Sequence, residues 1–216
     1  VVKAQDASLH LRPAAKLISE HKKQFGDQLS AVPIFIHSSI RDDEAGMVLN
    51  KFTSLTLDSM QLSSFMNVAA GGIEMDLPYE NSTITVELVK VNLLTADFKV
   101  LTDKSNGSGV PYKPGLFYRG IVKGDDNSLV SFSFFDHEVA GIISRGNENI
   151  VVGKMHNGIS HTNHYIIYSD RDFISPHTTS CSTIDDPVYA STLLQNIATA
   201  STLRTTNCVR LYYEID

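Results

Sequence analysis

The stretch that decides the fold is residues 115–143, GLFYRGIVKGDDNSLVSFSFFDHEVAGII, in which short apolar runs alternate with turn signals. Within it, residues 129–135 read LVSFSFF, so that apolar and serine side chains fall on opposite faces of an extended chain. Runs of the same kind continue to HYIIYS at 164–169. Because turns this short can join only antiparallel neighbours, the sequence predicts a five-stranded antiparallel meander over 115–168.

A hairpin signal inside this segment supports the same interpretation. Asn157-Gly158 lies between two of the apolar runs. Asn-Gly is the most favourable pair for a two-residue hairpin turn, because both turn positions need positive φ. The predicted fold class is therefore mainly β (a β-rich α+β protein), with an antiparallel meander, sandwich or barrel-like sheet.

The N-terminal half predicts one or two short helices beside further strands. Residues 12–25 have helical apolar spacing and stop at Gly26, and residues 59–70 have a second apolar stripe, which we assign to the core rather than to a cofactor. The stripes are Ala14, Leu17, Ile18 and Phe25 in the first helix and Met60, Leu62, Phe65, Met66 and Ala69 in the second. Strands are expected over 31–40 (entered through Pro33), 51–59 and 83–91.

Charge and length exclude two classes of partner. The chain has 18 Lys+Arg against 24 Asp+Glu and contains no basic run, whereas a nucleic-acid partner demands clustered cations. Its apolar runs are far shorter than the roughly 20 residues that span a bilayer, so we expect no membrane insertion. A chain of 216 residues can also bury a sizeable core without cross-links, so the two cysteines do not fix its compartment.

Composition divides the chain into three parts. Residues 1–174 are expected to form a β-rich domain, with a candidate subdomain boundary near 107–114. Residues 175–207 are rich in Ser and Thr and have little apolar periodicity, which is typical of a linker or functional loop. Residues 208–216, CVRLYYEID, resume strand-like alternation, and we interpret them as the first strand of a further domain.

The N-terminus and two tripeptides bear on localisation. VVKAQDASLH lacks the basic start and apolar stretch of a secretion signal, so either the protein is cytosolic or the signal has been removed. Asn81 and Asn106 begin N-x-S/T tripeptides, the acceptor pattern for N-glycosylation. Such tripeptides arise often by chance and carry little weight alone.

Catalytic signatures are missing from the sequence. It contains no GxSxG elbow, no phosphate-binding GxxxxGK[ST], no CxxC and no GxGxxG. His137-Glu138 begins HEVAG, but the second histidine of a zinc-binding HExxH would fall at Gly141. We therefore do not expect this chain to be an enzyme in its own right.

Two other clusters admit a metal interpretation beside a simpler one. His156, His161 and His164 lie within nine residues, but the odd spacing of the last two puts them on opposite faces of a strand, so we favour exposed hairpin histidines. Asp125 and Asp126 lie in a segment too short for a calcium loop and are expected to form a plain turn.

Cys181, in HTTSCSTIDD, is the one reactive side chain that stands out. It is either an incidental thiol, one half of a bridge to Cys208, or an exposed thiolate offered to a metal. The residues alone leave these three alternatives open.

The order of these parts resembles the propeptide region of reprolysin-type (adamalysin-like) zinc metallopeptidases. That family shows a Tyr or similar residue before Gly, a turn ending in Ser, an apolar strand, and a second Gly at the next strand. Here the corresponding residues are Tyr118, Gly120, Ser128 and Gly141. HYIIYSD resembles the segment that closes the propeptide's sheet, and a linker cysteine and the first strand of the catalytic domain follow it. The resemblance covers about 110–216.

The resemblance implies a role and a partner. It implies a secreted propeptide that keeps a catalytic domain latent through a thiolate–zinc contact from Cys181, and that assists the folding of that domain. The cofactor implied is Zn²⁺ in the parent peptidase, with none in this chain, and the partner is the cognate catalytic domain in cis. We expect a monomer. The family's cysteine is commonly followed by Gly, whereas Ser182 stands here.

A different class of function is a free-standing β-sandwich module that binds carbohydrate or a surface protein. Exposed aromatic rings would be its signature, and Tyr112, Tyr118 and Tyr168 are the candidates. The absence of Trp and the aromatic share of 8% count against it.

Overall fold

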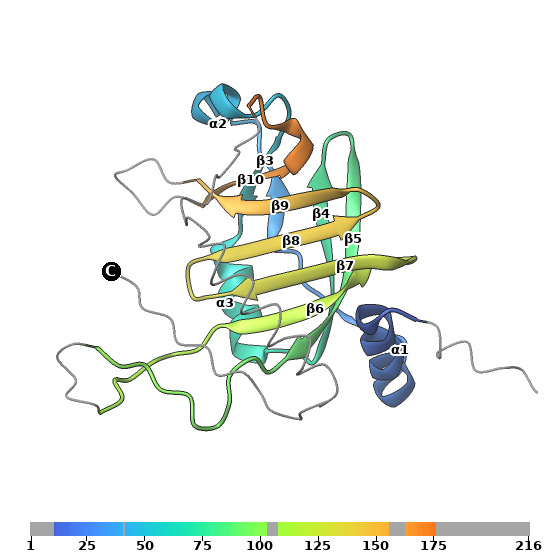
Figure 1. Ribbon diagram of the computed structural model, residues 1–216, viewed down its shortest axis with the longest axis vertical. Helices are drawn as coiled ribbons and strands as arrows, with labels where there is room; N and C mark the ends of the chain where they lie inside the picture. Colours follow the sequence, from blue (N-terminus) through green and yellow to red (C-terminus); the bar gives the residue numbers. More distant parts are fainter. Residues whose placement is uncertain (1–10, 41, 103–107, 156–162, 176–216) are drawn as a thin grey trace, which may run out of the picture. The chain divides into compact units, whose positions relative to one another are not determined.

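The computed structural model describes residues 11–40, 42–102, 108–155 and 163–175. All of them belong to one compact unit. The described part is mainly β, as predicted, and its strands form one curled sheet (Figure 1). None of its helices is both long and apolar enough to cross a membrane.

The sheet has ten strands in the order β1-β4-β5-β6-β7-β8-β9-β10-β3-β2. The elements are α1 (Pro13–Phe25), β1 (Ser30–Ala31), β2 (Phe35–His37), α2 (Asp43–Val48), β3 (Thr53–Leu57), α3 (Ser59–Val68), β4 (Gly72–Tyr79), β5 (Ser82–Val91), β6 (Leu116–Val122), β7 (Asp125–Phe134), β8 (Val139–Arg145), β9 (Glu148–Lys154), β10 (His164–Ser169) and a 3-10 turn, η3 (Asp170–Asp172). From β6 to β10, consecutive strands of the chain are antiparallel neighbours in the sheet, which confirms the predicted meander. β5 and β6, which flank residues 107–114, are also antiparallel neighbours.

One short segment of chain forms both ends of the sheet. β1 pairs in parallel with β4 and β2 pairs antiparallel with β3, yet only three residues separate β1 from β2. The Val32 N–H donates to the Glu74 carbonyl, and the Ile34 carbonyl accepts from the Asp58 N–H. Pro33, which has no N–H, lies between these two bonds. The single strand predicted here is therefore two short strands, and the sheet curls because they join its ends.

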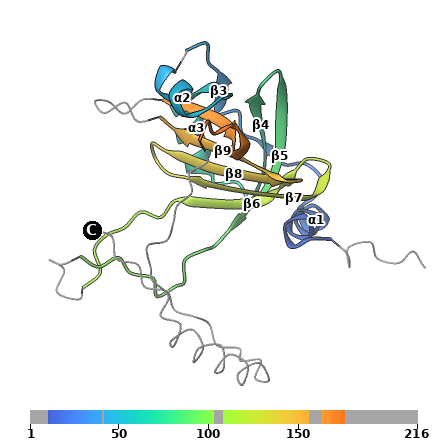
Figure 2. The same ribbon diagram turned by 45° about the horizontal axis from the view of Figure 1, so that its top comes forward.

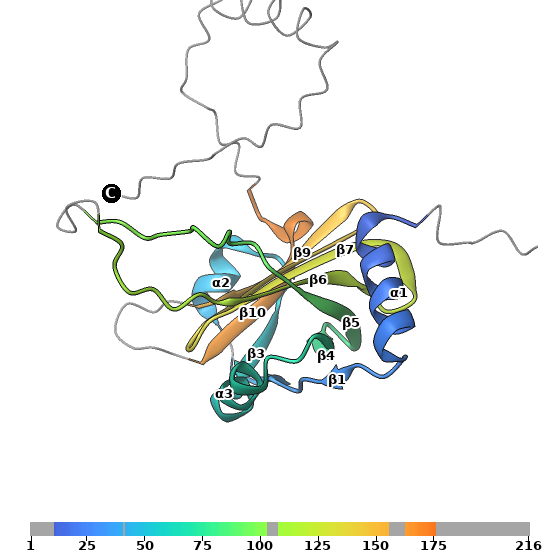
Figure 3. The same cartoon turned by 90° about the horizontal axis from the view of Figure 1, so that it is seen from below.

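The core fills the concave side of the sheet. α3 lies on that side (Figure 3). Its Leu62 and Phe65 are buried, and the Phe65 ring contacts those of Tyr118 and Phe134. The prediction of an α3 core stripe was wrong for Met60, which is largely exposed. Its position near the helix start turns it away from the sheet.

Two helices cover the flanks of the convex side. α1 lies beside β6 and β7 (Figure 2). Its Ala14, Ala15 and Ile18 pack on Val89 and Ile121. At the opposite flank α2 packs on β10. We predicted at most two helices, and α2 is a third; it has only six residues, too few for a periodic pattern. Gly26 ends α1 as predicted, but Phe25 is largely exposed rather than in the core.

Two buried tyrosines predict how stability depends on alkaline pH. Burial raises the pKa of Tyr118 and of Tyr165 to about 12. The unfolded chain releases these protons near pH 10, so between about pH 10 and 12 the folded state holds more protons and stability falls with pH. We expect each ring to cost roughly 2 kcal/mol by pH 12, measured by urea unfolding.

The matched variants are Tyr118→Phe and Tyr112→Phe. Tyr118 is fully buried and donates to the Ala70 carbonyl, whereas Tyr112 is about half exposed. Tyr118→Phe should reduce the loss of unfolding free energy between about pH 10 and 12, whereas Tyr112→Phe should leave that loss as in wild type. Equal slopes in all three proteins would contradict the assignment.

Candidate functional site: a docking surface

Two stretches of chain extend from one end of the sheet between β5 and β6. We call residues 92–102 and 108–115 the arms; they run side by side away from the strands (Figure 1). The Val110 N–H donates to the Val100 carbonyl at 2.9 Å, which ties one arm to the other. An isolated bridge of this kind holds the arms together without making them part of the sheet.

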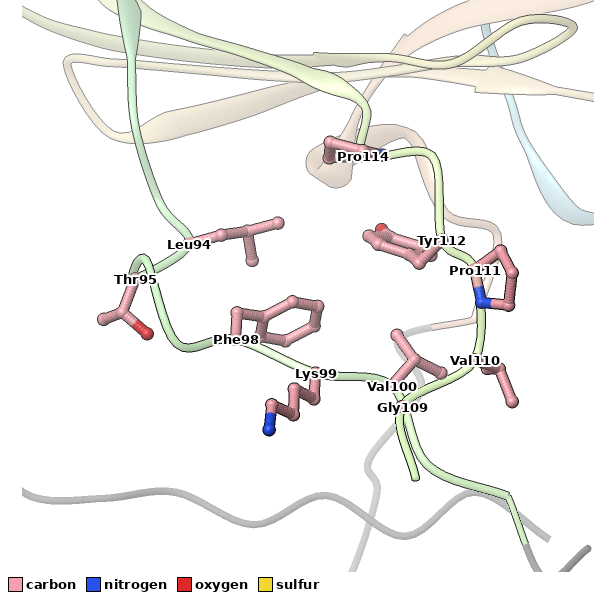
Figure 4. A pocket seen from close by; sticks show the side chains of 10 residues that line it. All are labelled: Leu94, Thr95, Phe98, Lys99, Val100, Gly109, Val110, Pro111, Tyr112 and Pro114. Atoms are coloured by element: carbon pink, nitrogen blue, oxygen red, sulfur yellow. The ribbon is translucent and has the colours of Figure 1, made fainter. Parts of the chain in front are cut away.

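The arms enclose an open hollow of about 700 Å³ (Figure 4). The rings of Phe98 and Tyr112 face each other across it, with centroids 5.8 Å apart and planes tilted by 56°. The lining residues are Leu94, Thr95, Phe98, Lys99, Val100, Gly109, Val110, Pro111, Tyr112 and Pro114. The lining is mainly apolar, with Lys99 as its charged side chain.

The arms leave an unusual amount of apolar surface in contact with solvent. About half of each of four large side chains is exposed: Leu93, Phe98, Leu101 and Tyr112. Scattered exposed apolar residues are normal on a protein surface, whereas four of them on two bridged stretches of chain, two of which (Phe98 and Tyr112) line a hollow, indicate a contact site. The arms are therefore the candidate binding element of the described part.

The second arm is fixed at its base. A Cβ on Gly115 would lie 2.8 Å from the Phe134 carbonyl oxygen and 2.6 Å from the ring of Phe135, so only glycine fits there. Beside it the ammonium of Lys113 lies 2.7 Å from a carboxylate oxygen of Asp136, in the β7–β8 turn. The arm thus leaves the sheet at a defined point.

A second feature lies on the convex side, between the two helical flanks. We call the outward positions over the stretch in which β7, β8 and β9 pair with one another the neutral face, because none of them is charged; Asp125 and Asn127, at the start of β7, precede that stretch. The positions are Leu129, Ser131, Ser133, Ala140, Ile142, Ser144, Asn149, Val151 and Gly153. At the chain's charged fraction of 19%, nine positions would carry about two charges. An uncharged strip of small and aliphatic side chains suits contact with another protein surface.

The arms and the neutral face are continuous. Where the second arm meets the sheet, the ring of Phe117 in β6 contacts the ring of Phe135, which follows β7. The ring centroids are 6.2 Å apart, and the rings pack edge to face. Phe117 pairs with Ser133, one of the neutral positions. We refer to the arms, these two rings and the neutral face together as the docking surface.

The docking surface has no catalytic constellation. Its hollow is lined by no carboxylate, imidazole or thiol, so it offers no pair of groups for acid–base or nucleophilic chemistry. Within the described ranges no three His, Cys, Asp or Glu side chains come together as a metal site. What the geometry can do is bind.

The residues that carry the family resemblance have structural roles. Tyr118 is buried and donates to the Ala70 carbonyl; Ser128 accepts from the Val122 N–H at 2.7 Å and donates to the Asp125 carbonyl at 2.7 Å. A Cβ on Gly120 would meet the backbone of β5, and one on Gly141 would meet the ring of Phe132. These four residues fix strand spacing and the β6–β7 turn.

The predicted switch residue and two of the three clustered histidines are outside the part of the chain that the structure describes. Cys181, Cys208, His156 and His161 fall outside the described residues. His164 is described, and the prediction that it is exposed was wrong. Its side chain is 15% exposed, its Nδ1 lies 3.4 Å from an oxygen of Asp42, and its buried Nε2 has no hydrogen-bond partner among the described residues.

Two further predictions need correction. Asp125 and Asp126 begin β7 rather than form the turn, which lies at Lys123-Gly124, where Gly124 has φ +82°. Of the tyrosines proposed for sugar stacking, Tyr118 is fully buried and Tyr168 packs edge-on against Phe173; Tyr112 alone of the three lies in the hollow.

Comparisons of the sequence with known protein families and with curated proteins find no match.

Proposed function

We propose that this chain is the propeptide of a secreted, reprolysin-type zinc endopeptidase and keeps its catalytic domain latent. The observation that carries the proposal is the order of parts: a β-rich domain with tightly constrained resemblance positions, then a Ser/Thr-rich segment with Cys181, then the strand-like 208–216. The proposal assigns the zinc to the partner domain. No group of three metal-ligand side chains lies within the described part, which is compatible with that assignment.

The proposed switch depends on the sulfur of Cys181. A catalytic zinc keeps an open position at which it binds and polarises water. In the latent state the Cys181 sulfur takes that position, its proton is lost to solvent, and the water is displaced. A tether raises the effective concentration of the thiolate to around millimolar. Cutting the linker removes this advantage, and the thiolate dissociates.

The docking surface gives the proposal its second contact. A thiolate alone does not select one enzyme, whereas a shaped surface does. Aromatic side chains such as Phe98 and Tyr112 are the residue types that carry most of the binding energy at interfaces. The neutral face favours a partner surface that is also uncharged, because a charged partner side chain packed against it would be buried without an opposite charge.

The test is inhibition of the zinc endopeptidase domain encoded in the same reading frame. The chain is added to the separately produced domain, and cleavage of a fluorogenic peptide is followed. We expect wild type to inhibit and Cys181→Ala to inhibit at least about tenfold more weakly, a difference of 1.4 kcal/mol. Cys208→Ala is the matched control and should inhibit at least as well as wild type, since losing a bridge would free Cys181.

A double variant, Phe98→Ala with Tyr112→Ala, separates docking from the switch. It should weaken inhibition about tenfold while urea unfolding stays unchanged, because both rings are half exposed. Equal inhibition by wild type and Cys181→Ala would remove the switch. No inhibition by wild type at about millimolar chain, a concentration that replaces the lost tether, would overturn the proposed function. Glycan-array binding that Tyr112→Ala abolishes would favour the carbohydrate-binding alternative, for which this tyrosine in the hollow is the supporting observation.

A further inference from the structure

We propose that Asn81 carries an N-linked glycan, and that this glycan marks the end of the sheet that faces away from the partner. The inference rests on the secretion that forms part of the proposed function. It starts from the tripeptide Asn81-Ser82-Thr83, whose placement distinguishes it from a chance match.

The tripeptide lies at the tip of the β4–β5 hairpin. Tyr79 pairs with Ser82, so Glu80 and Asn81 form a two-residue turn. Residues 80–83 are all exposed. The turn is held from beneath, because Thr53 Oγ1 accepts from the Glu80 N–H at 2.7 Å and Glu80 has φ +52°. A rigid, exposed tip presents the acceptor asparagine to solvent and leaves a bulky substituent free of the core.

The chemistry needs an amide nitrogen and a nearby hydroxyl, and the tripeptide provides both. The donor class is a lipid-linked oligosaccharide diphosphate. The bond from sugar C1 to the diphosphate oxygen breaks, a new bond forms from C1 to Asn81 Nδ2, and the amide loses one proton as the lipid diphosphate leaves. The acceptor pattern requires the hydroxyl of the third residue, here Thr83.

The surface beside Asn81 has room for the first sugar. An open hollow of about 450 Å³ is lined by Asn50, Lys51, Phe52, Glu80 and Asn81. It combines amide and charged groups with one aromatic ring, Phe52, which is partly buried. Polar groups beside a ring face suit a sugar, which has hydroxyls at its rim and C–H groups on its faces. The hollow lies next to the acceptor residue itself.

Asn81 and the arms lie at opposite ends of β5. Asn81 immediately precedes this ten-residue strand, and the arms begin where it ends (Figure 1). At about 3.3 Å per residue the two sites are roughly 30 Å apart. A glycan on Asn81 therefore leaves the arms accessible, and a partner bound at the arms leaves the glycan in solvent.

The experiment translates the chain, fused to a cleavable secretion signal, with endoplasmic-reticulum microsomes. The protease-protected product is analysed by endoglycosidase shift and peptide mass. We expect Asn81→Gln and Thr83→Ala each to remove one glycan. Ser82→Ala is the matched control and should keep it, because the middle position is unrestricted apart from Pro. A protected product whose residue-81 peptide is unmodified overturns the inference.

Inhibition assays keep this outcome distinct from failure of the proposed function. Glycosylated and enzymatically deglycosylated chains should inhibit the peptidase domain within about twofold of each other. A tenfold gain on deglycosylation would overturn the placement of the glycan away from the partner. An unmodified Asn81 in a chain that still inhibits overturns the glycan alone, whereas a modified Asn81 in a chain that does not inhibit overturns the propeptide assignment alone.

Discussion

Gly120→Ala is expected to destabilise the folded sheet severely. A Cβ at this position would lie 1.8 Å from the Glu87 carbonyl oxygen and 2.9 Å from Leu88 Cα, both in the backbone of β5. β5 cannot retreat easily, because it is paired on its other edge with β4 over eight residues. We expect a loss of more than about 4 kcal/mol, a large share of the 5–15 kcal/mol that holds a typical domain together. Circular dichroism and urea unfolding measure it.

Gly153→Ala is the matched control. Gly153 also lies within a strand of the meander, β9, but a Cβ there would have no atom within 4 Å and its φ is ordinary. Its stability should stay within about 0.5 kcal/mol of wild type or rise slightly, because alanine reduces the entropy of the unfolded chain. If Gly120→Ala folded as stably as Gly153→Ala, the close approach of β6 to β5 would be contradicted.

The meander could be predicted because its information is local. Alternating runs such as LVSFSFF and short turns between them dictate antiparallel neighbours, and the structure has this pairing throughout β6–β10. β4 carries the same signal, since Ile73, Met75 and Leu77 alternate with less apolar residues, although no strand was predicted there.

The closure of the sheet was not predictable in the same way. The parallel pairing of Ser30 with Ile73 joins residues more than forty positions apart, and nothing in either short segment specifies its partner. α2 is likewise set by its context: Asp42 caps it by accepting from the Ala45 N–H at 2.7 Å, and Ala45 and Leu49 pack with Ile166. Tertiary contacts decide these elements.

The candidate site could be predicted only in part from the sequence. A subdomain boundary was expected near 107–114, but the apolar residues on both sides of it, Leu93 to Leu101 and Val110 to Tyr112, were not predicted to be exposed. The neutral face follows in part from the alternation already noted, since Ser131 and Ser133 were assigned to the face opposite the apolar side chains. Its lack of charge becomes informative only when β8 and β9 are placed beside β7.

Lys22→Met is expected to cost roughly 3–5 kcal/mol, because it leaves a buried carboxylate without its partner. The ammonium of Lys22 in α1 lies 2.7 Å from both oxygens of Glu87 in β5. The Glu87 side chain is only 6% exposed, and Lys22 is its hydrogen-bond partner beneath the helix. Methionine keeps the apolar stem of lysine, so the loss reports on charge rather than on packing. Urea unfolding of the variant measures it.

Lys123→Met tests whether burial is the cause. Lys123 and Glu74 also form an ion pair at 2.7 Å, but their side chains are 52% and 34% exposed. Water and salt screen such a pair, so the expected loss is much smaller than that of Lys22→Met. Equal losses for the two lysines would show that distance alone, and not burial, sets the cost.

The loss of unfolding free energy caused by Lys22→Met also has an upper limit, which the packing of α1 sets. A stranded Glu87 can regain water if α1 detaches from β5 and β6, at the expense of the packing of Ile18 on Val89 and Ile121. The loss therefore cannot exceed the free energy with which α1 packs on the sheet. Faster hydrogen exchange confined to α1 would show that the helix detaches and that this limit is reached. Adding Glu87→Met to Lys22→Met removes the charge and should restore most of the stability. A double variant as unstable as the single one would mean that the carboxylate is not the source of the loss.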